Sequence, residues 1–385
     1  MSVRQLLVDI HTHCYLPRYA AFLRQRSFAP RIFTRNQEER LLILDDEPLS
    51  GRPVGPQYWD RDEKLKFMDL HNIDVSIVST ANPWLDFLDK PSTASQLANE
   101  LNEDLENYCA TSPGVDGFDT MKRLYGFGLL PLIKGIGTED LLQTVKHITG
   151  LPHLKGIIMG TRGIGKGLDD PALEPLWEAL SNTKLVVFLH PHYGLGSGAK
   201  EAWGDQENGH VLPLAIGFPV ETTTAITRLI LAGVYDRHPD LKILLAHSGG
   251  ALPQLSSRIA SCISHDPLVS SRLKHDARYY VSRLYYDAVN YGPEEMGFVA
   301  DVIGRGTAYS SIPGAREDRL VGYKRMLFGT DHPFFPPLGK EAKWASVLEN
   351  LQAIDEVQRW EKEHKNAVRG GNAIELFGLG HEQGK

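Results

Sequence analysis

Cysteine is scarce in this sequence, and its placement argues against two classes of protein. Three cysteines occur among 385 residues, and no two of them form a Cys-x-x-Cys pair. They are Cys14, Cys109 and Cys262. An odd number of distant cysteines indicates neither a disulfide framework nor a zinc finger. A hydrophobic core must therefore stabilise the fold, and a chain of this length with 42% hydrophobic residues can build one.

The chain also lacks concentrated charge and long apolar runs. Its 41 Lys and Arg residues against 48 Asp and Glu residues give a formal net charge of −7. No basic block stands out, so nucleic acid is not an expected partner. The first residues do not resemble a signal peptide, and no stretch approaches the roughly 18 apolar residues of a membrane span. We therefore expect a cytoplasmic protein that binds neither nucleic acid nor a membrane.

Short apolar runs recur along the chain between stretches with helical periodicity. Eight runs have the composition of strands buried on both faces: Leu6–His11, Val75–Thr80, Leu124–Leu129, Lys155–Gly160, Leu185–His190, Lys242–His247, Arg283–Ala288 and Arg325–Thr330. The seventh fits least well, because Arg283 and Asp287 interrupt it. This α/β alternation predicts a (β/α)8 TIM-type barrel that spans residues 1–385 as one domain. Counting alone also permits an open doubly wound sheet.

Five of the intervening stretches carry further expectations. Residues 171–181, 221–234 and 343–354 show the periodicity of amphipathic helices. Residues 15–62 separate the first two strands, and a connection of that length usually carries function or a structure of its own. We expect a lid or small subdomain over the barrel mouth there. Residues 305–322, rich in Gly, Ser, Arg and Asp, are expected to form an exposed insertion.

The first strand ends in a pair of histidines, His11 and His13, separated by one residue. Alternate residues of an extended chain point the same way, so both imidazoles project together from the strand. That geometry suits two ligands of one metal ion. Taken alone, the pair is as well explained by two ordinary histidines near the N-terminus.

Other strand ends strengthen the metal hypothesis. His190 closes the fifth run, His247 closes the sixth, and Asp331 follows the eighth. In a (β/α)8 barrel, the catalytic groups come from the C-terminal ends of several strands. A histidine at one strand end is commonly a satisfied core residue, but four strand ends of the same polarity are hard to explain in that way. We therefore expect one site at the barrel mouth.

One motif points elsewhere and is set aside. The stretch from Gly160 to Lys166 follows a strand and matches most of a phosphate-binding P-loop. The next residue is Gly167, where that motif requires Ser or Thr to hold Mg²⁺. A loop that faces the substrate is the better interpretation.

Taken together, these motifs resemble the amidohydrolase superfamily, in its mononuclear decarboxylase branch. That branch includes the aminocarboxymuconate-semialdehyde and γ-resorcylate decarboxylases, and the likeness is greatest to the fungal isoorotate (uracil-5-carboxylate) decarboxylases. The matching stretches are Asp9–His13, Gly51–Pro53, Ala81–Trp84, Gly165–Pro171, Phe188–Gly194, Gly217–Thr223, Leu245–Gly250 and Phe328–Pro337. The resemblance extends from residue 6 to about residue 375.

The resemblance implies a metal centre. His11, His13, His190 and Asp331 would bind one divalent metal, with zinc expected and manganese possible. His247 would lie beside the metal and polarise the substrate or a water, and Asp331 would also handle the proton. Relatives with two metals bridge them through a lysine at the end of the fourth strand. Here that strand ends in Met-Gly, which favours a single metal.

The resemblance also implies substrate contacts. Arg52 and Asn82 would hold the carboxylate or ring oxygens of a small cyclic acid, and Phe334 would wall the pocket. Arg258 would reach the site of a neighbouring subunit, in a homodimer or higher homo-oligomer. The segment after Gly194 and the 305–322 insertion depart from the family pattern, which leaves the substrate open.

Three functions remain compatible with these residues. The first is decarboxylation of isoorotate, a hydroxybenzoate or an aminocarboxymuconate-type acid. The second is hydrolysis of a lactone or cyclic amide, in which the same ligands hold a water of lowered pKa. The third is a barrel that binds metal without catalysis. Arg52, Asn82 and the 217–223 stretch favour decarboxylation as part of the resemblance, and the complete ligand set disfavours the third.

Overall fold

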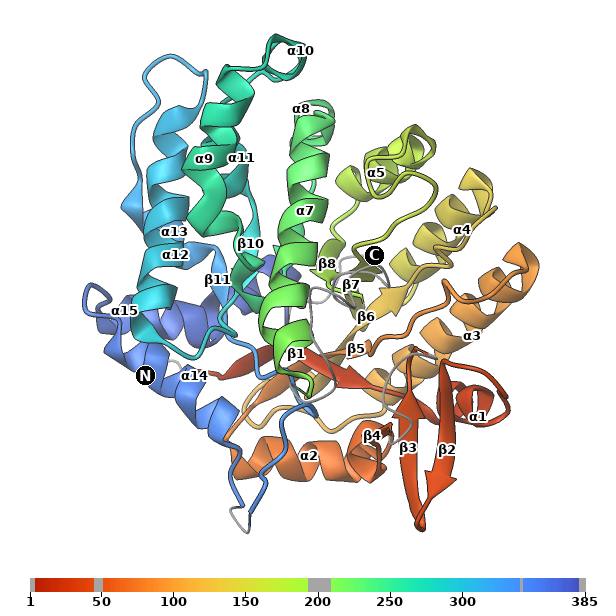
Figure 1. The fold of residues 1–385 in the computed structure, drawn as a ribbon. Helices are drawn as coiled ribbons and strands as arrows, with labels where there is room; N and C mark the ends of the chain where they lie inside the picture. The colour runs from red at the N-terminus through yellow and green to blue at the C-terminus, as the bar shows by residue number, and fades with distance from the viewer. Residues whose placement is uncertain (1–3, 45–50, 193–208, 340–341, 381–385) are drawn as a thin grey trace.

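Eight parallel strands form the centre of the molecule, in the order in which they occur along the chain (Figure 1). The computed structural model describes residues 4–44, 51–192, 209–339 and 342–380. The strands are β1 (Val8–Cys14), β5 (Val75–Thr80), β6 (Leu124–Leu129), β7 (Leu154–Gly160), β8 (Val186–His190), β9 (Ile243–Leu245), β10 (Tyr285–Asp287) and β11 (Met326–Leu327). Every residue of the first five of these strands is buried, as expected for strands with a packed barrel interior on one face and helices on the other.

The last strand returns to the first and closes the barrel. Ile10 donates its backbone N–H to the carbonyl oxygen of Phe328 at 3.0 Å, and Asp331 donates to the carbonyl oxygen of His11 at 2.8 Å. A parallel bridge also joins Thr12 to residue 332. The predicted TIM-type barrel is therefore confirmed, and the open doubly wound sheet is excluded.

The last three strands are shorter than predicted. The runs expected at 242–247, 283–288 and 325–330 pair over only two or three residues each. Beyond β9 and β11 the chain turns, because His247, Ser248 and Asp331 adopt positive φ angles. An extended strand cannot continue through such a residue.

Helices surround the barrel and follow most strands in sequence (Figure 1). They are α1 (Pro17–Arg24), α2 (Arg61–Leu70), α3 (Pro91–Ala110), α4 (Thr138–Thr149), α5 (Glu174–Ser181), α7 (Phe218–Leu231), α8 (Val234–Arg237), α9 (Leu252–Ser264), α10 (Pro267–Ser270), α11 (Ala277–Arg283), α12 (Pro293–Gly306), α13 (Arg319–Lys324), α14 (Ala345–Glu356), α15 (Lys362–Asn366) and α16 (Asn372–Phe377). Shorter 3-10 or π turns are η1 (Pro56–Tyr58), η2 (Pro171–Leu173), η5 (Pro213–Gly217), η6 (His247–Gly249), η7 (Thr307–Tyr309) and η8 (Ala367–Gly371). The three predicted helices correspond to η2 with α5, to α7 with the start of α8, and to α14.

The 15–62 segment has a structure of its own. It contains α1, η1 and a small antiparallel sheet of β2 (Arg31–Arg35), β3 (Glu38–Leu42) and β4 (Arg52–Pro53). This sheet projects from the side of the barrel where α1 and α2 lie (Figure 1). A small structured insertion is thus present between the first two barrel strands, while its action as a lid stays a prediction.

The 305–322 segment differs from the simple insertion expected. Its first residues end α12 and its last residues belong to α13, so it is the connection between two barrel helices. The part between η7 and α13 is mostly exposed, with Ile312 at 60%. The predicted exposure is therefore confirmed, but the segment includes helix at both ends.

One helical stretch is more apolar than the sequence analysis allowed. Pro213–Leu231 is 19 residues long with a mean hydropathy of 1.3, enough to cross a membrane by length and composition alone. Its α7 part buries Ile226 and Leu229. A helix of a protein core passes the same test, so this observation is weak evidence for a membrane span. The sequence analysis expected no apolar stretch near the length of a membrane span, and Pro213–Leu231 comes closer to that length than expected.

A buried amide side chain on α3 forms hydrogen bonds with the last residue of β6. Asn102 is 1% exposed, donates to the carbonyl oxygen of Leu129 at 3.0 Å and accepts from the N–H of the same residue at 2.7 Å. Both backbone groups lose their partner if the amide is removed. Asn102→Ala is therefore expected to lower the free energy of unfolding by about 2–4 kcal/mol.

Chemical denaturation of Asn102→Ala and Asn107→Ala checks this expectation. Asn107 is exposed on the same helix, so it controls for the change in helix propensity. Equal stability of the two variants would contradict the role of the amide.

Candidate active site

The two histidines of β1 meet at the barrel mouth as predicted. The Nε2 atoms of His11 and His13 lie 3.0 Å apart, and each is 3.3 Å from Oδ1 of Asp331. Both imidazoles are buried. Asp331 approaches from the turn after β11, so barrel closure alone brings these three side chains together.

His190 and His247 complete the group. His190 ends β8, and its Nδ1 hydrogen bonds to the carbonyl oxygen of Pro191 at 2.8 Å, which turns Nε2 toward the other imidazoles. His247 begins the turn after β9, and its Nε2 lies 3.8 Å from Oδ2 of Asp331. Ligand atoms of His11, His190, His247 and Asp331 all lie within 4.8 Å of one another.

This geometry differs in one respect from the predicted ligand set. The sequence analysis placed His13 among the ligands and His247 beside the metal. In the structure, His247 belongs to the compact group of four, and His13 contacts that group through His11 and Asp331. All five side chains are brought together, and the division between metal ligands and neighbours stays a prediction.

The donor atoms fit a divalent cation. The Nε2 atom of His190 is buried and has no hydrogen-bond partner among the described residues, and Oδ1 of Asp331 is buried beside the Nε2 atoms of His11 and His13. Burial lowers the pKa of His13 to about 4 and that of His190 well below the usual value, so both imidazoles are neutral and offer a lone pair. Buried polar atoms normally have partners, and a cation bound between them would satisfy both.

Burial and neighbouring charges have opposite effects on the pKa values of Asp331 and His11. Burial raises the pKa of Asp331, but the positive charge of His11 and hydrogen bonds from the imidazoles outweigh it and hold that pKa well below the usual range. Burial lowers the pKa of His11, but Asp331 and Asp287 raise it to about 10. Asp331 is thus an anion, which suits it as a ligand of a divalent cation.

Asp287 is a residue of the site that the sequence analysis missed. It appeared there only as an interruption of the seventh apolar run. The structure buries it completely at the end of β10, where Oδ2 accepts from Nδ1 of His11 at 2.6 Å and from the backbone N–H of His247 at 2.9 Å. Oδ1 accepts from the N–H of Ser248 at 2.7 Å. A carboxyl group at the C-terminal end of a barrel strand was the signal that could have identified it.

The predicted substrate contacts are only partly at the site. The ring of Phe334 lies 5.5 Å from that of His13, so it lies beside the group, and its role as a wall of the pocket stays a prediction. Asn82 is buried and donates its amide N–H to the backbone oxygen of His192, which ties it to the loop after β8. Arg52 is half-buried on β4. Arg258 is exposed on α9, and the structure does not place it in the site of its own chain.

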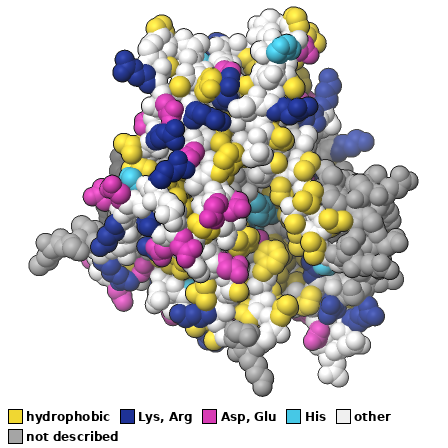
Figure 2. Space-filling view, turned by 60° about the vertical axis from the view of Figure 1, so that its left-hand side comes forward, with side chains coloured by type: hydrophobic (Ala, Val, Ile, Leu, Met, Phe, Trp, Pro, Cys, Tyr) yellow, Lys and Arg dark blue, Asp and Glu magenta, His cyan; other side chains and the backbone are white. Residues whose placement is uncertain are grey.

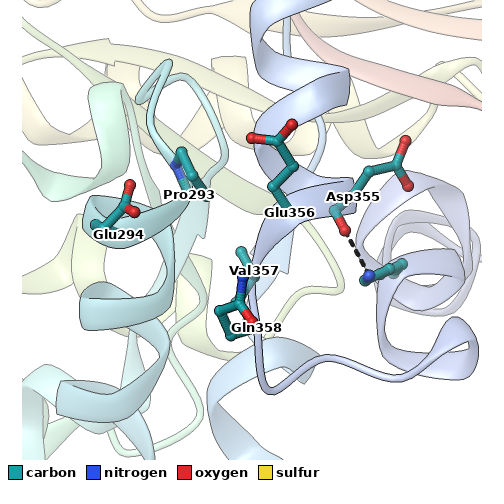
Figure 3. Close-up of a pocket in the computed structure, with 7 residues that line it drawn as sticks. Pro293, Glu294, Asp355, Glu356, Val357 and Gln358 are labelled. Atoms are coloured by element: carbon teal, nitrogen blue, oxygen red, sulfur yellow. Dashed lines mark hydrogen bonds between the residues drawn. The ribbon is translucent and has the colours of Figure 1, made fainter.

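A separate cavity lies away from these residues. Its volume is about 430 Å³, and it lies between the start of α12 and the end of α14 (Figure 3). The residues that line it are Pro293, Glu294, Asp355, Glu356, Val357, Gln358 and Lys365. None of the predicted site residues contributes to it, so the chemistry belongs to the barrel mouth.

The fold and the site define a class, a (β/α)8 barrel with a candidate metal site at the C-terminal ends of its strands. Comparison with known sequences identifies the family, because the profile of the amidohydrolase family matches residues 119–379. The chain belongs to the amidohydrolase family.

Three similar proteins cover nearly all of the chain. It is 27% identical over 380 residues to the 2-amino-3-carboxymuconate-6-semialdehyde decarboxylase of Dictyostelium discoideum, covering 98% of this chain and 92% of that one. It is 27% identical to the gamma-resorcylate decarboxylase of a Rhizobium species, covering 86% and 96%. The crystal structure of Metarhizium anisopliae IDCase in apo form superposes with a TM-score of 0.85, at 39% identity and 98% coverage of both chains.

The contacts of Asp287 generate a prediction for metal binding. A carboxylate behind a ligating imidazole fixes the ring and raises its basicity. Asp287→Asn is therefore expected to weaken metal affinity about 10- to 100-fold, measured by competition with a chromogenic chelator. Asp301→Asn changes a carboxylate on the outer helix α12, where it pairs with Arg359, and should leave that affinity unchanged. Equal affinities in the two variants would argue against the role of Asp287.

Proposed function

We propose that this enzyme removes CO₂ from isoorotate or a closely similar small cyclic carboxylate, with one divalent metal bound by His11, His13, His190 and Asp331. The observation that carries the proposal is the convergence of these side chains at the barrel mouth, in a chain 39% identical to the Metarhizium IDCase. Isoorotate is favoured because the sequence resembles the fungal isoorotate decarboxylases at the motifs around Asn82 and Phe334.

The chain is a metal-dependent decarboxylase, a carboxy-lyase, and hydrolysis of a lactone or cyclic amide is the weaker alternative. The relatives that cover nearly the whole chain are decarboxylases of small carboxylic acids. Their match runs through the strands that carry the site as well as the helices around them, because it includes 98% of the chain in the case of the Dictyostelium enzyme.

A bound divalent cation would act as a Lewis acid that draws electron density from the substrate oxygens. The residues of the chain have to do the rest. Arg52 supplies a fixed positive charge that can pair with a carboxylate or ring oxygen and orient the ring. Phe334 covers one side of the pocket. Arg258 of a neighbouring subunit would complete it, which requires the predicted homodimer.

The reaction needs one proton at the ring carbon that loses CO₂. Protonation of that carbon uses a pair of ring electrons, and cleavage of its bond to the carboxylate returns a pair to the ring as CO₂ leaves. Asp331 is ionised, so it must first receive a proton before it can deliver one. His247 lies 3.8 Å from its Oδ2 atom and is the neighbour we assign to pass that proton.

Zinc is the metal we expect, because three imidazoles and one carboxylate suit it and leave a position for an oxygen ligand. Manganese can use the same donors.

Exposed hydrophobic side chains gather on one part of the surface (Figure 2), and Val211 and Ile216 beside α7 are 67% and 49% exposed. Such side chains support a homo-oligomer. The cytoplasmic location stays a prediction.

The substrate is tested by incubating the zinc- or manganese-loaded enzyme with isoorotate, 2,6-dihydroxybenzoate, 2,3-dihydroxybenzoate and an aryl lactone. Release of CO₂ and formation of uracil from isoorotate are expected. Asp331→Ala should reduce the rate at least about 100-fold, because it removes a metal ligand and the proton carrier together. Ring opening of the lactone without CO₂ release would overturn the reaction, and CO₂ from a benzoate alone would overturn the substrate.

The role of Arg52 predicts a loss of substrate affinity. A charge-assisted hydrogen bond to an anionic substrate contributes about 1.5–3 kcal/mol, so Arg52→Gln should lower kcat/KM about 10- to 100-fold. Arg52→Lys should recover only part of this, because a lysine cannot form the bidentate pair. Arg35→Gln, at the exposed end of β2 in the same small sheet, is the matched control. An unchanged kcat/KM in Arg52→Gln would remove Arg52 from the pocket.

A further inference from the structure

Asp331 has a backbone conformation that its neighbours must hold in place. Its φ angle is +58°, in the left-handed region that residues other than glycine seldom adopt. Its N–H donates to the carbonyl oxygen of His11, and its own carbonyl oxygen accepts from Phe334 at 2.9 Å. Such a conformation persists only where the surrounding structure determines it, so the contacts of the adjacent residues matter.

Asp9 provides one set of these contacts from β1. It is completely buried, and its carboxylate accepts from both the N–H of Thr330, at 3.0 Å, and the hydroxyl of Thr330, at 2.7 Å. The same carboxylate lies 3.3 Å from the backbone N–H of His11. One side chain therefore links the residue before Asp331 to the backbone of a histidine of the site.

The residue after Asp331 is held by the same hydroxyl. Thr330 Oγ1 accepts from the N–H of His332 at 3.2 Å while it donates to Asp9. The imidazole of His332 stacks on Phe67 with 3.7 Å between ring centroids. The Oγ1 atom of Thr330 thus contacts both Asp9 and the residue after Asp331.

Lys64 brings a buried positive charge to this group. It projects from α2, is 3% exposed, and its Nζ lies 3.5 Å from Nδ1 of His332. Burial lowers the pKa of Lys64 to about 8, and attraction to Asp9 opposes that shift. A buried ammonium is costly without a polar partner, and the imidazole of His332 supplies one. The reaction as described above uses none of these residues.

We propose that Asp9, Thr330 and Lys64 act together as positioning residues that hold the carboxylate of Asp331 against the imidazoles of the site. Lys64 acts through the imidazole of His332, the residue after Asp331, and Asp9 acts through the hydroxyl of Thr330, the residue before it. The group touches neither metal nor substrate. Its loss should therefore weaken metal binding and slow turnover, and leave substrate affinity nearly unchanged.

The sharpest test compares Thr330→Val with Thr330→Ser. Valine keeps the shape and removes the hydroxyl, whereas serine keeps the hydroxyl. Thr330→Val is expected to raise the dissociation constant for Zn²⁺ and to lower kcat, each about 10-fold or more, with KM changed less than about 2-fold. Thr330→Ser should recover most of both losses. Thr144→Val, a buried hydroxyl on α4 far along the chain, controls for removal of a buried hydrogen bond.

A double-mutant cycle tests whether Asp9 and Lys64 hold the same turn. Asp9→Asn and Lys64→Met should each weaken Zn²⁺ binding, and Lys64→Met should add little in the Asp9→Asn background, because the turn from Thr330 to His332 has already lost its support. The visible spectrum of the Co²⁺-substituted protein should shift in Thr330→Val and not in Thr144→Val, because it reports the arrangement of the ligands. Circular dichroism establishes that each variant is folded.

Two results would overturn the proposal. One is a folded Thr330→Val whose metal affinity and Co²⁺ spectrum match those of Thr144→Val. The other is full additivity of Asp9→Asn and Lys64→Met, which would show independent packing roles. The metal and spectral measurements do not depend on the substrate, and only the kcat measurement rests on the proposed function. A wrong substrate would leave the first two readouts intact.

Discussion

Closure of the barrel between β11 and β1 is the constraint on which the site depends. Asp9 and Thr330 lie 321 positions apart in the chain, and the hydrogen bonds that join their strands bring them together. The same closure brings Asp331 within 3.3 Å of His11 and His13. No local segment holds the site by itself, because its members come from β1, β8 and the turns after β9 and β11. Any change that loosens the closing strands therefore reaches the ligands directly.

The site concentrates polar groups where folding alone would favour apolar ones. Imidazoles and carboxylates are buried against one another, and the Nε2 atom of His190 and the Nδ1 atom of His247 lack hydrogen-bond partners in the described structure. Such an arrangement is costly unless a bound ion compensates it. Two further buried carboxylates contact this group from outside. Asp287 binds His11 and the turn at His247, and Asp9 binds Thr330 in the turn at Asp331. Two buried carboxylates thus orient the group from two sides.

Family membership and geometry together narrow the chemistry. The amidohydrolase fold supports both hydrolysis and decarboxylation, so the fold does not decide between them. The decision comes from the relatives, because the match to the Dictyostelium decarboxylase includes 98% of the chain.

The local sequence pattern was sufficient to predict much of the fold and the position of the site. Apolar runs predicted the five long strands, because strands buried on both faces are mostly apolar. The alternation of His11 and His13, and the polar residues that end the apolar runs at His190, His247 and Asp331, predicted where the site would form. The strands β9 and β11 were predicted too long, because the left-handed turns at His247 and Asp331 depend on acceptors supplied by other strands. The predicted start of β10, Arg283, is instead the last residue of α11.

Tertiary structure alone decided the rest. The sequence analysis took Asp287 only as an interruption of a strand and gave Asp9 and Lys64 no role, because a side chain's partners depend on which strands and helices lie beside it. The sequence by itself determined the barrel, its family likeness and the residue types at its mouth, since these follow from periodicity and motif. Only the closed barrel decided that the carboxylates of Asp9 and Asp287 lie behind the site and that the carboxylate of Asp331 belongs to it. The reason is that burial and contact between distant residues exist only in the folded chain.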